Sequence, residues 1–254
     1  MINKESKFIR FSMNLSLMMF FSTLIFGQEK PNIIFIMADD LGYGDIGVYG
    51  QQLIKTPNID KLSDDGMKFT DYYSGASVCA PARSVLMTGL HVGHTRVRGN
   101  FGKGGVVGLA GKEGRIPLKE IDLTIAEVLQ DKGYRTGMIG KWGLGEPNTS
   151  GEPNKKGFDY FYGFYNQRRA HSYYPEYIWE NTRKVTLYGN ENEHNHQYTH
   201  NLFADKAINF IDINQQIPFF LYLPICIPHS RYELPDNGIY THKKGWTDLQ
   251  KKYA

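Results

Sequence analysis

Short apolar runs alternate with amphipathic segments along most of the chain. Residues 33–37 (IIFIM) are apolar without alternation, which is typical of a strand buried on both faces of a parallel sheet. Similar runs predict strands within residues 134–145 and 217–225, and residues 69–73 are a further candidate strand. These runs predict the strands of one mostly parallel sheet.

Helical spacing of apolar positions marks the segments between these runs. Residues 123–132 are the clearest case, because Asp122 or Thr124 can cap the segment and a glycine follows it. Helices are also predicted at residues 56–66, 82–90 and 201–213. Strands that alternate with helices of this length predict an α/β fold.

Polar and glycine-rich stretches separate these elements. Residues 98–117 hold many glycines and predict a surface loop, and residues 145–198 predict irregular structure with short strands. Residues 241–254 look like the start of a helix without a cap or a packing partner. We therefore interpret the chain as the N-terminal part of a longer protein.

The first 27 residues are typical of an export signal. A basic leader precedes an apolar stretch at residues 11–26, which is shorter than the roughly 20 apolar residues that span a membrane. An uncleaved membrane anchor is the alternative. Cleavage would leave residues 28–254 as the N-terminal part of a catalytic domain, in the periplasm or secreted.

The net charge of the chain gives little information about its binding partners once this leader is removed. The leader carries two of the three net positive charges of the chain, so the remainder is close to neutral. No run of lysine and arginine remains that would predict binding to nucleic acid.

Two adjacent carboxylates, Asp39 and Asp40, follow the first predicted strand. Open α/β sheets bind ligands at the carboxyl ends of their strands. Neighbouring carboxylates repel unless a cation compensates them, and oxygen ligands favour hard cations such as Ca²⁺ or Mg²⁺. An ordinary turn or a helix cap is the alternative interpretation.

Cys79 is one of only two cysteines, and it lies in SVCAPARSVLMTG (residues 77–89). A free cysteine is often a small buried residue, and an exported protein could pair it with Cys226 in a disulfide. No local pattern typical of a cysteine protease surrounds it. The combination Cys-x-Pro-x-Arg at the start of a predicted helix is far more specific than a lone cysteine.

Five segments of the chain, in order, resemble the type I sulfatases, the formylglycine-dependent members of the alkaline phosphatase superfamily. They are PNIIFIMADDLGYGD (31–45), TPNIDKLSDDGMKFTDYY (56–73), SVCAPARSVLMTG (77–89), GMIGKWGLG (137–145) and PFFLYLPICIPH (218–229). The cysteine segment is the most specific of them. The resemblance implies an alkaline-phosphatase-like α/β fold, with a mostly parallel central sheet sandwiched by helices and incomplete at the C-terminus.

The resemblance also implies that a maturation enzyme oxidises Cys79 to formylglycine (3-oxoalanine). One hydroxyl of the hydrated aldehyde would attack sulfur and displace the alcohol, and the second would collapse the sulfated intermediate and release sulfate. Asp39 and Asp40, with the modified Cys79, would bind Ca²⁺, with Mg²⁺ as the alternative. On this basis a disulfide to Cys226 is not expected.

Three further catalytic residues follow from the same resemblance. Arg83, one helical turn after Cys79, would reach back to the diol, and Lys141 would neutralise a sulfate oxygen. His229 would contact the sulfate and its leaving oxygen. Taken singly, Lys141 could be a solvated loop lysine and His229 a core histidine.

The chain departs from the family in two ways. The family has Lys-Trp-His-Leu-Gly where this chain has Gly143 in place of the histidine that acts as a base. His171 is the first candidate replacement and His94 the second. The family's Asp-Asn metal ligands and a further lysine would lie beyond position 254, so the 254-residue chain is expected to be inactive alone.

Candidate substrate-binding residues lie in two segments, chosen because arginine binds anions and aromatic rings stack on sugars. They are Arg96, Arg98 and Asn100 in the first segment, and Arg168, Arg169, Tyr173 and Tyr174 in the second. His194, His196 and His200 do not have standard zinc spacing and are interpreted as part of a polar loop.

The sequence therefore predicts a hydrolase that removes sulfate from a sulfated oligosaccharide or polysaccharide. A phosphonate or phosphodiester hydrolase with the same formylglycine is one alternative. A non-catalytic glycan-binding relic is the other.

Overall fold

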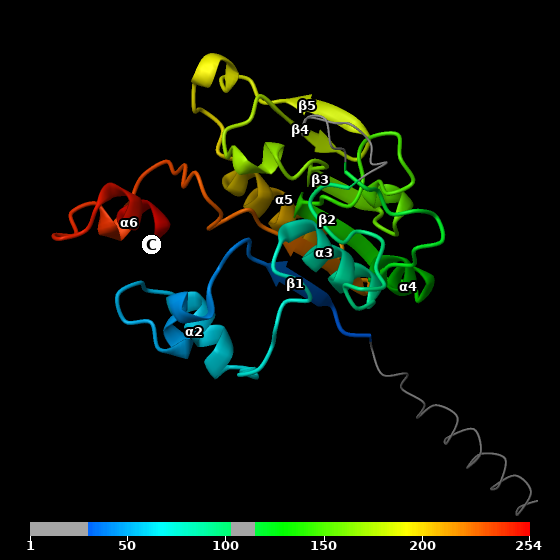
Figure 1. Ribbon diagram of the computed structural model, residues 1–254, viewed down its shortest axis with the longest axis horizontal. Coiled ribbons are helices and arrows are strands. Elements are labelled where there is room, and N and C mark those ends of the chain that lie inside the picture. Colours follow the sequence, from blue (N-terminus) through cyan, green and yellow to red (C-terminus); the bar gives the residue numbers. More distant parts are fainter. Residues whose placement is uncertain (1–29, 103–114) are drawn as a thin grey trace, which may run out of the picture. The chain divides into compact units, whose positions relative to one another are not determined.

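A six-stranded sheet forms the centre of the computed structural model, which describes residues 30–102 and 115–254 (Figure 1). The predicted export signal lies outside the described residues. In spatial order the strands are β1 (Ile33–Met37), β6 (Phe219–Pro224), β2 (Arg135–Lys141), β3 (Tyr160–Phe164), β4 (Tyr177–Glu180) and β5 (Arg183–Thr186). The first four are parallel, and β4 and β5 are added antiparallel. The prediction of a mostly parallel sheet is confirmed.

Helices cover both faces of this sheet (Figure 1). They are α3 (Cys79–Thr88) and α4 (Ile125–Asp131) on one face and α5 (Thr199–Ile213) on the other. Neighbouring side chains of β6 alternate between two core clusters: Phe220 and Tyr222 pack with residues of α3 and α4, whereas Phe219 and Leu221 pack with residues of α5. The predicted sandwich of helices around the sheet is therefore confirmed.

The predicted helices lie where the apolar spacing placed them, with small shifts at their ends. Thr124 caps α4 and accepts a hydrogen bond from the backbone of Glu127, whose side chain bonds back to the cap. The predicted helix at residues 82–90 begins earlier, so that Cys79 is its first residue. Two further α-helices among the described residues are α2 (Pro57–Asp64) and α6 (Asp248–Tyr253). None of the helices in the described ranges is long and apolar enough to cross a membrane.

Two strand predictions are corrected by the structure. β1 is not buried on both faces, because Ile34 and Ile36 are 47% and 60% exposed. Within the described residues, β1 is an edge strand that pairs only with β6, and its exposed side chains, Ile34 and Ile36, lie on one outer face of the strand. Residues 69–73 form no strand and are exposed throughout.

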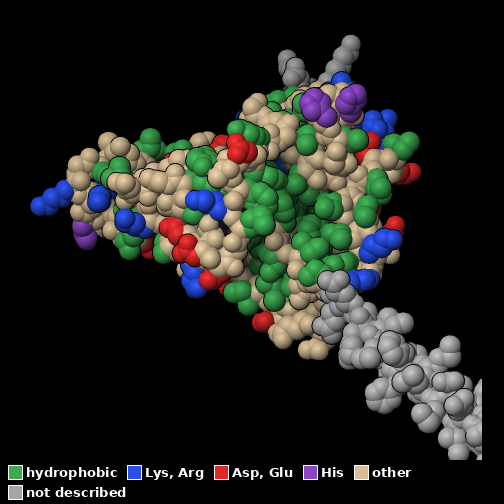
Figure 2. Space-filling model, turned by 90° about the horizontal axis from the view of Figure 1, so that it is seen from below, with side chains coloured by type: hydrophobic (Ala, Val, Ile, Leu, Met, Phe, Trp, Pro, Cys, Tyr) green, Lys and Arg blue, Asp and Glu red, His purple; other side chains and the backbone are tan. Residues whose placement is uncertain are grey.

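An apolar groove of about 880 Å³ begins at this outer face of β1. Its lining includes Ile36, Ile59 of α2, Ile225 and Tyr253 of α6. Figure 2 shows hydrophobic side chains gathered near the middle of one face of the molecule.

Candidate active site

Parallel strands bring four segments of the chain together at one edge of the sheet. Asp39 follows β1, Lys141 ends β2, His171 lies beyond β3 and His229 lies beyond β6. Because these strands run in the same direction, their carboxyl ends share this edge. The fold therefore collects residues that are up to 190 positions apart in the sequence.

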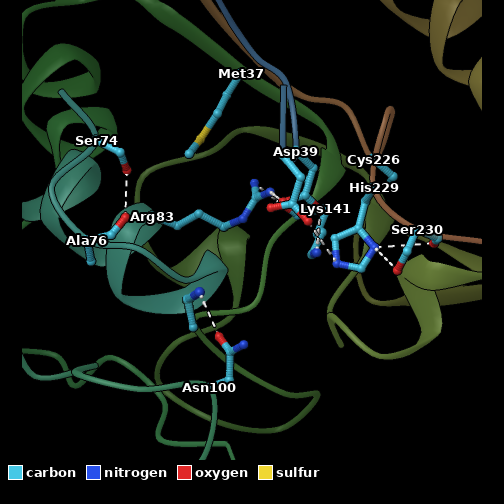
Figure 3. A network of polar contacts seen from close by, with 12 residues as sticks. Met37, Asp39, Ser74, Ala76, Arg83, Asn100, Lys141, Cys226, His229 and Ser230 are labelled. Carbon is cyan, nitrogen blue, oxygen red and sulfur yellow. Dashed lines mark hydrogen bonds and ion pairs between the residues drawn. The ribbon is translucent and has the colours of Figure 1, made fainter. Parts of the chain in front are cut away.

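Asp39 is the centre of a buried charge network (Figure 3). Its carboxylate forms an ion pair with Lys141 and lies 3.4 Å from Nη2 of Arg83. The side chains of both cations are fully buried, and Asp39 itself is 5% exposed. Burial raises the pKa of Asp39, but the two neighbouring cations outweigh it and hold the pKa below 3.8.

This network contains two buried cations and one buried carboxylate. Arg83 donates from Nη1 to the backbone carbonyl of Lys141 at 2.9 Å, whereas its Nε has no hydrogen-bond partner among the described residues. A buried donor without a partner and a surplus of positive charge both favour an anionic ligand. The network can therefore stabilise an oxyanion such as sulfate or phosphate.

Cys79 lies next to this network, at the first turn of α3. Its Sγ, a carboxylate oxygen of Asp39 and a ring nitrogen of His229 all lie within 4.8 Å of one another. Asn100 accepts a hydrogen bond from the backbone of Ala80 at 3.0 Å and so fixes the start of the helix (Figure 3). Burial raises the pKa of the Cys79 thiol above its usual value, so the thiol is neutral at pH 7.

Cys79 and Cys226 are both free cysteines, so the expectation that they form no disulfide is confirmed. Cys226 is fully buried, which raises the pKa of its thiol to about 12.

Asp40 differs from its neighbour in exposure and in backbone conformation. Its side chain is 64% exposed, its φ is 65°, and its carboxylate lies 3.5 Å from Nε2 of His229. Asp39 and Asp40 both carry carboxylate oxygens of the kind that Ca²⁺ prefers. Only Asp39 belongs to the group of side chains that lie close enough to share one ion, so the pairing of Asp39 with Asp40 around Ca²⁺ stays a prediction.

His171 and His229 form a stacked pair beside the carboxylates. Their ring centroids are 4.1 Å apart with an interplanar angle of 22°. Burial, together with the positive charge of Lys141, lowers the pKa of His171 to about 4. At neutral pH His171 is therefore unprotonated and can accept a proton.

The structure also places three further predicted site residues, Arg96, Asn100 and His94. Arg96 forms an ion pair with Asp122, in which its Nη2 donates to Oδ1 at 2.9 Å. Asn100 supports the start of α3, as described above. His94 is exposed on a turn beside His91, so the structure does not bring it to Cys79.

Arg168 and Arg169 lie on the segment that carries His171. Arg168 is exposed, whereas the guanidinium of Arg169 lies 3.6 Å from the ring centroid of Tyr177. Both line a polar cavity next to the histidine pair.

The polar-loop interpretation holds for His194 and His196, which are exposed and precede α5. It is corrected for His200, which lies in the first turn of α5, where its Nε2 accepts a hydrogen bond from the backbone of Cys226. Within the described ranges, the only histidine, cysteine and acidic side chains close enough to share a metal ion are Asp39, Cys79 and His229.

Sequence reasoning missed two buried polar residues at this edge of the sheet. Arg115 is 5% exposed, and its Nη1 donates to the backbone carbonyl of Asn100. Gln167 is 1% exposed, and its Nε2 has no hydrogen-bond partner among the described residues. Neither residue belongs to a local motif, so only the fold could reveal them.

Gln167 fills the space where a side chain at position 143 would project. Gly143 has a φ of 85°, and a Cβ built on it would lie 2.2 Å from Nε2 of Gln167. A left-handed glycine and a neighbouring amide therefore occupy the place where the family resemblance predicts a histidine.

We expect Gly143→Ala to lower the free energy of unfolding by about 2–3 kcal/mol. A left-handed conformation costs a residue with a Cβ about 1–2 kcal/mol, and displacing Gln167 adds a packing penalty. Gly89→Ala is the matched control, since Gly89 has a φ of 67° with nothing within 4 Å of its Cβ position. Urea unfolding of both variants checks this, and equal losses would contradict a steric role for Gln167.

Comparisons with known proteins converge on one kind of hydrolase. The family model described as sulfatase matches residues 31–252. The arylsulfatase of Hemicentrotus pulcherrimus is 35% identical over 235 residues, covering 85% of this chain and 40% of that protein. Human arylsulfatase G is 46% identical over 138 residues, covering 53% of this chain and 24% of that protein.

Two solved structures are also similar. The crystal structure of Ps i-CgsB has a TM-score of 0.70 and 31% identity, covering 89% of this chain and 51% of that one. The structure of BT4656 in complex with its substrate D-glucosamine-2-N,6-O-disulfate has a TM-score of 0.66 and 28% identity, covering 85% and 38%. The chain thus spans about half the length of these relatives, or less.

Proposed function

The chain belongs to the sulfatase family, and on this premise we propose that its site serves to hydrolyse a sulfate ester of a carbohydrate. The observation that carries the proposal is the buried network in which Arg83 and Lys141 together outweigh the charge of Asp39. Cys79 lies directly beside this positive surplus. An anionic ester group would gain from the surplus as negative charge shifts onto its oxygens.

The carbohydrate part of the proposal is supported by the similar structures. BT4656 was solved with D-glucosamine-2-N,6-O-disulfate as its substrate, and Ps i-CgsB was solved in complex with a neocarrahexaose. Both ligands are carbohydrates, and we assign the same class of substrate to this chain.

Cys79 would enter the reaction as formylglycine, made by a maturation enzyme during export. The hydrated aldehyde supplies a hydroxyl nucleophile together with a second hydroxyl for its own release. Support comes from the thiol itself, since burial raises its pKa and a neutral thiol is a poor nucleophile. The position at the start of α3 places residue 79 against Asp39 and His229.

Asp39 and Asp40 would hold Ca²⁺, or Mg²⁺ in its place, which supplies Lewis-acid chemistry when bound. Arg83 and Lys141 would orient the sulfate group, and His229 would donate a hydrogen bond to the leaving oxygen. The two carboxylates supply only part of a calcium shell, so we expect residues 1–254 alone to hydrolyse sulfate esters poorly.

We expect His171→Ala to lower turnover of a sulfated substrate by about 100-fold, because a positioned base contributes roughly that factor or more. The low pKa of His171, about 4, keeps the ring unprotonated across the neutral range. Steady-state kinetics on enzyme from the native host would measure the change. His94→Ala is the matched control, and a His171 variant with normal turnover would refute this role.

Mass spectrometry of the peptide that spans Cys79, after expression in the native host, tests the proposal as a whole. We expect the mass of an aldehyde in place of the thiol. An unmodified thiol would instead favour a non-catalytic glycan-binding protein, a reading that the glycine at position 143 also supports. Paired nitrophenyl sulfate and phosphate esters would separate a sulfatase from a phosphodiester or phosphonate hydrolase.

A further inference from the structure

A second positively charged cavity lies beside the histidine pair. It has a volume of about 650 Å³, and its charged lining residues are Arg168, Arg169, Arg231, Glu176 and Glu233. Two short segments form much of it, residues 168–176 and 231–233, and these segments also lead from His171 and from His229. The cavity is therefore connected along the chain to both histidines of the candidate active site, although neither histidine lines it.

We propose that this cavity binds a second anionic group, a sulfate or a carboxylate, on a sugar next to the one whose sulfate ester reacts. The proposal rests on the proposed function and names its substrate more narrowly, as an oligosaccharide with charges on neighbouring residues. The three guanidinium groups and two carboxylates of the lining leave one net positive charge. Guanidinium groups match the paired oxygens of sulfates and carboxylates.

The arginines of the cavity keep hydrogen-bond donors that contacts within the protein do not occupy. No carboxylate among the described residues forms an ion pair with Arg168, which is exposed. Arg231 approaches Glu233 only to 3.8 Å, and its side chain is 64% exposed. Arg169 is held by its stacking on Tyr177, while its Nε is buried without a hydrogen-bond partner among the described residues. Each arginine thus has donors left for a ligand.

The backbone holds Arg231 in this place at a cost. Arg231 and Tyr232 have φ angles of 95° and 47°, which residues with a side chain adopt rarely. Strained conformations of this kind persist where surrounding contacts impose them, and they cluster at binding sites. The strained turn sets Arg231 on the wall of the cavity.

Tyr173 joins the cavity to the histidine pair. Its hydroxyl donates to the backbone carbonyl of His229 at 2.5 Å, and its backbone N–H donates to Glu233 at 2.6 Å. Tyr173 is 1% exposed, so these bonds are shielded from water. The fold therefore fixes the distance between the cavity and the histidine pair, and a ligand that reaches both must carry its two anionic groups at that distance.

The test compares binding of three hexasaccharides by isothermal titration calorimetry. One carries sulfates on neighbouring sugars, one carries a single sulfate beside a uronate, and one carries a single sulfate only. We expect the unaltered protein to bind one or both of the first two at least about tenfold more tightly than the third. Whichever is preferred identifies the second anion as sulfate or carboxylate.

Arg168→Ala combined with Arg231→Gly is expected to remove this preference, by weakening binding of the first two hexasaccharides to the level of the third. Glycine at position 231 suits the left-handed backbone, so the variant removes the guanidinium without adding strain. Arg183→Ala on β5 is the control, since Arg183 is an exposed arginine away from the cavity lining. Circular dichroism confirms that each variant is folded.

Two results would overturn the proposal: no preference for a second anion, or a preference that survives in the double variant. Either result leaves the proposed hydrolysis untouched, because the singly sulfated ligand and the aldehyde at position 79 report on it separately. Conversely, loss of hydrolysis with an intact preference would refute the proposed function alone.

Discussion

Cys79→Ala is expected to lower sulfate-ester hydrolysis by at least about 1,000-fold. Alanine cannot be oxidised to an aldehyde, so the variant would lack the group that forms the covalent bond to sulfur. Removing a covalent nucleophile costs other hydrolases at least this factor, because the remaining binding groups give only residual rate enhancement. Steady-state kinetics on a nitrophenyl sulfate, with protein from the native host, would measure the loss.

Cys226→Ala is the matched control for this experiment. Cys226 is the other free cysteine, but it is fully buried and its pKa is raised to about 12. Its replacement should lower stability slightly and leave the rate per folded molecule unchanged. The catalytic role of Cys79 would be refuted if both variants kept the same rate.

The second large effect concerns stability. Asp39→Ala is expected to lower the free energy of unfolding by about 3–5 kcal/mol, the usual cost of leaving a buried charge without its partner. Both Lys141 and Arg83 are fully buried, and Asp39 is the carboxylate that faces them. Urea unfolding at pH 7 would measure the change in residues 30–254.

Asp40→Ala provides the contrast, because its side chain is 64% exposed and should contribute less than about 1 kcal/mol. Similar losses for the two variants would show that burial of the Asp39 network does not control stability.

The pH dependence of unfolding gives an independent check on the same carboxyl. The pKa of Asp39 in the folded chain lies below its ordinary value of 3.8. Its contribution to stability is therefore complete above pH 3.8 and is lost as the pH falls through the folded pKa. In Asp39→Ala this part of the acid-induced loss should be absent.

The sequence was most informative where local pattern and chain direction agree. Lys141 and His229 were assigned to the site by the family resemblance, and the apolar run near each of them correctly predicted a parallel strand. The α4 helix could be placed because Thr124 and Glu127 form a cap within four residues. Such signals lie within a few neighbouring residues, so they can be recognised in the sequence without knowledge of the fold.

Features that depend on distant packing could not be predicted in this way. The exposure of one face of β1 depends on what packs against that face, which its apolar residues do not reveal. Arg96 was expected to contact substrate, and its pairing with Asp122 depends on a loop 26 residues away. The contact between Gly143 and Gln167 could not be predicted from the sequence either, because neither residue belongs to a pattern that indicates which residue it contacts.

The pairing of Gly143 with Gln167 has a consequence for how this site can evolve. A histidine at position 143 would collide with Gln167 and would need a backbone that leaves the left-handed region. Replacing Gly143 by histidine alone is therefore expected to destabilise the protein. Replacing Gln167 by a smaller residue beforehand would remove the collision. The order of the two changes therefore matters, because Gln167 would have to change before a histidine at position 143 could be accommodated.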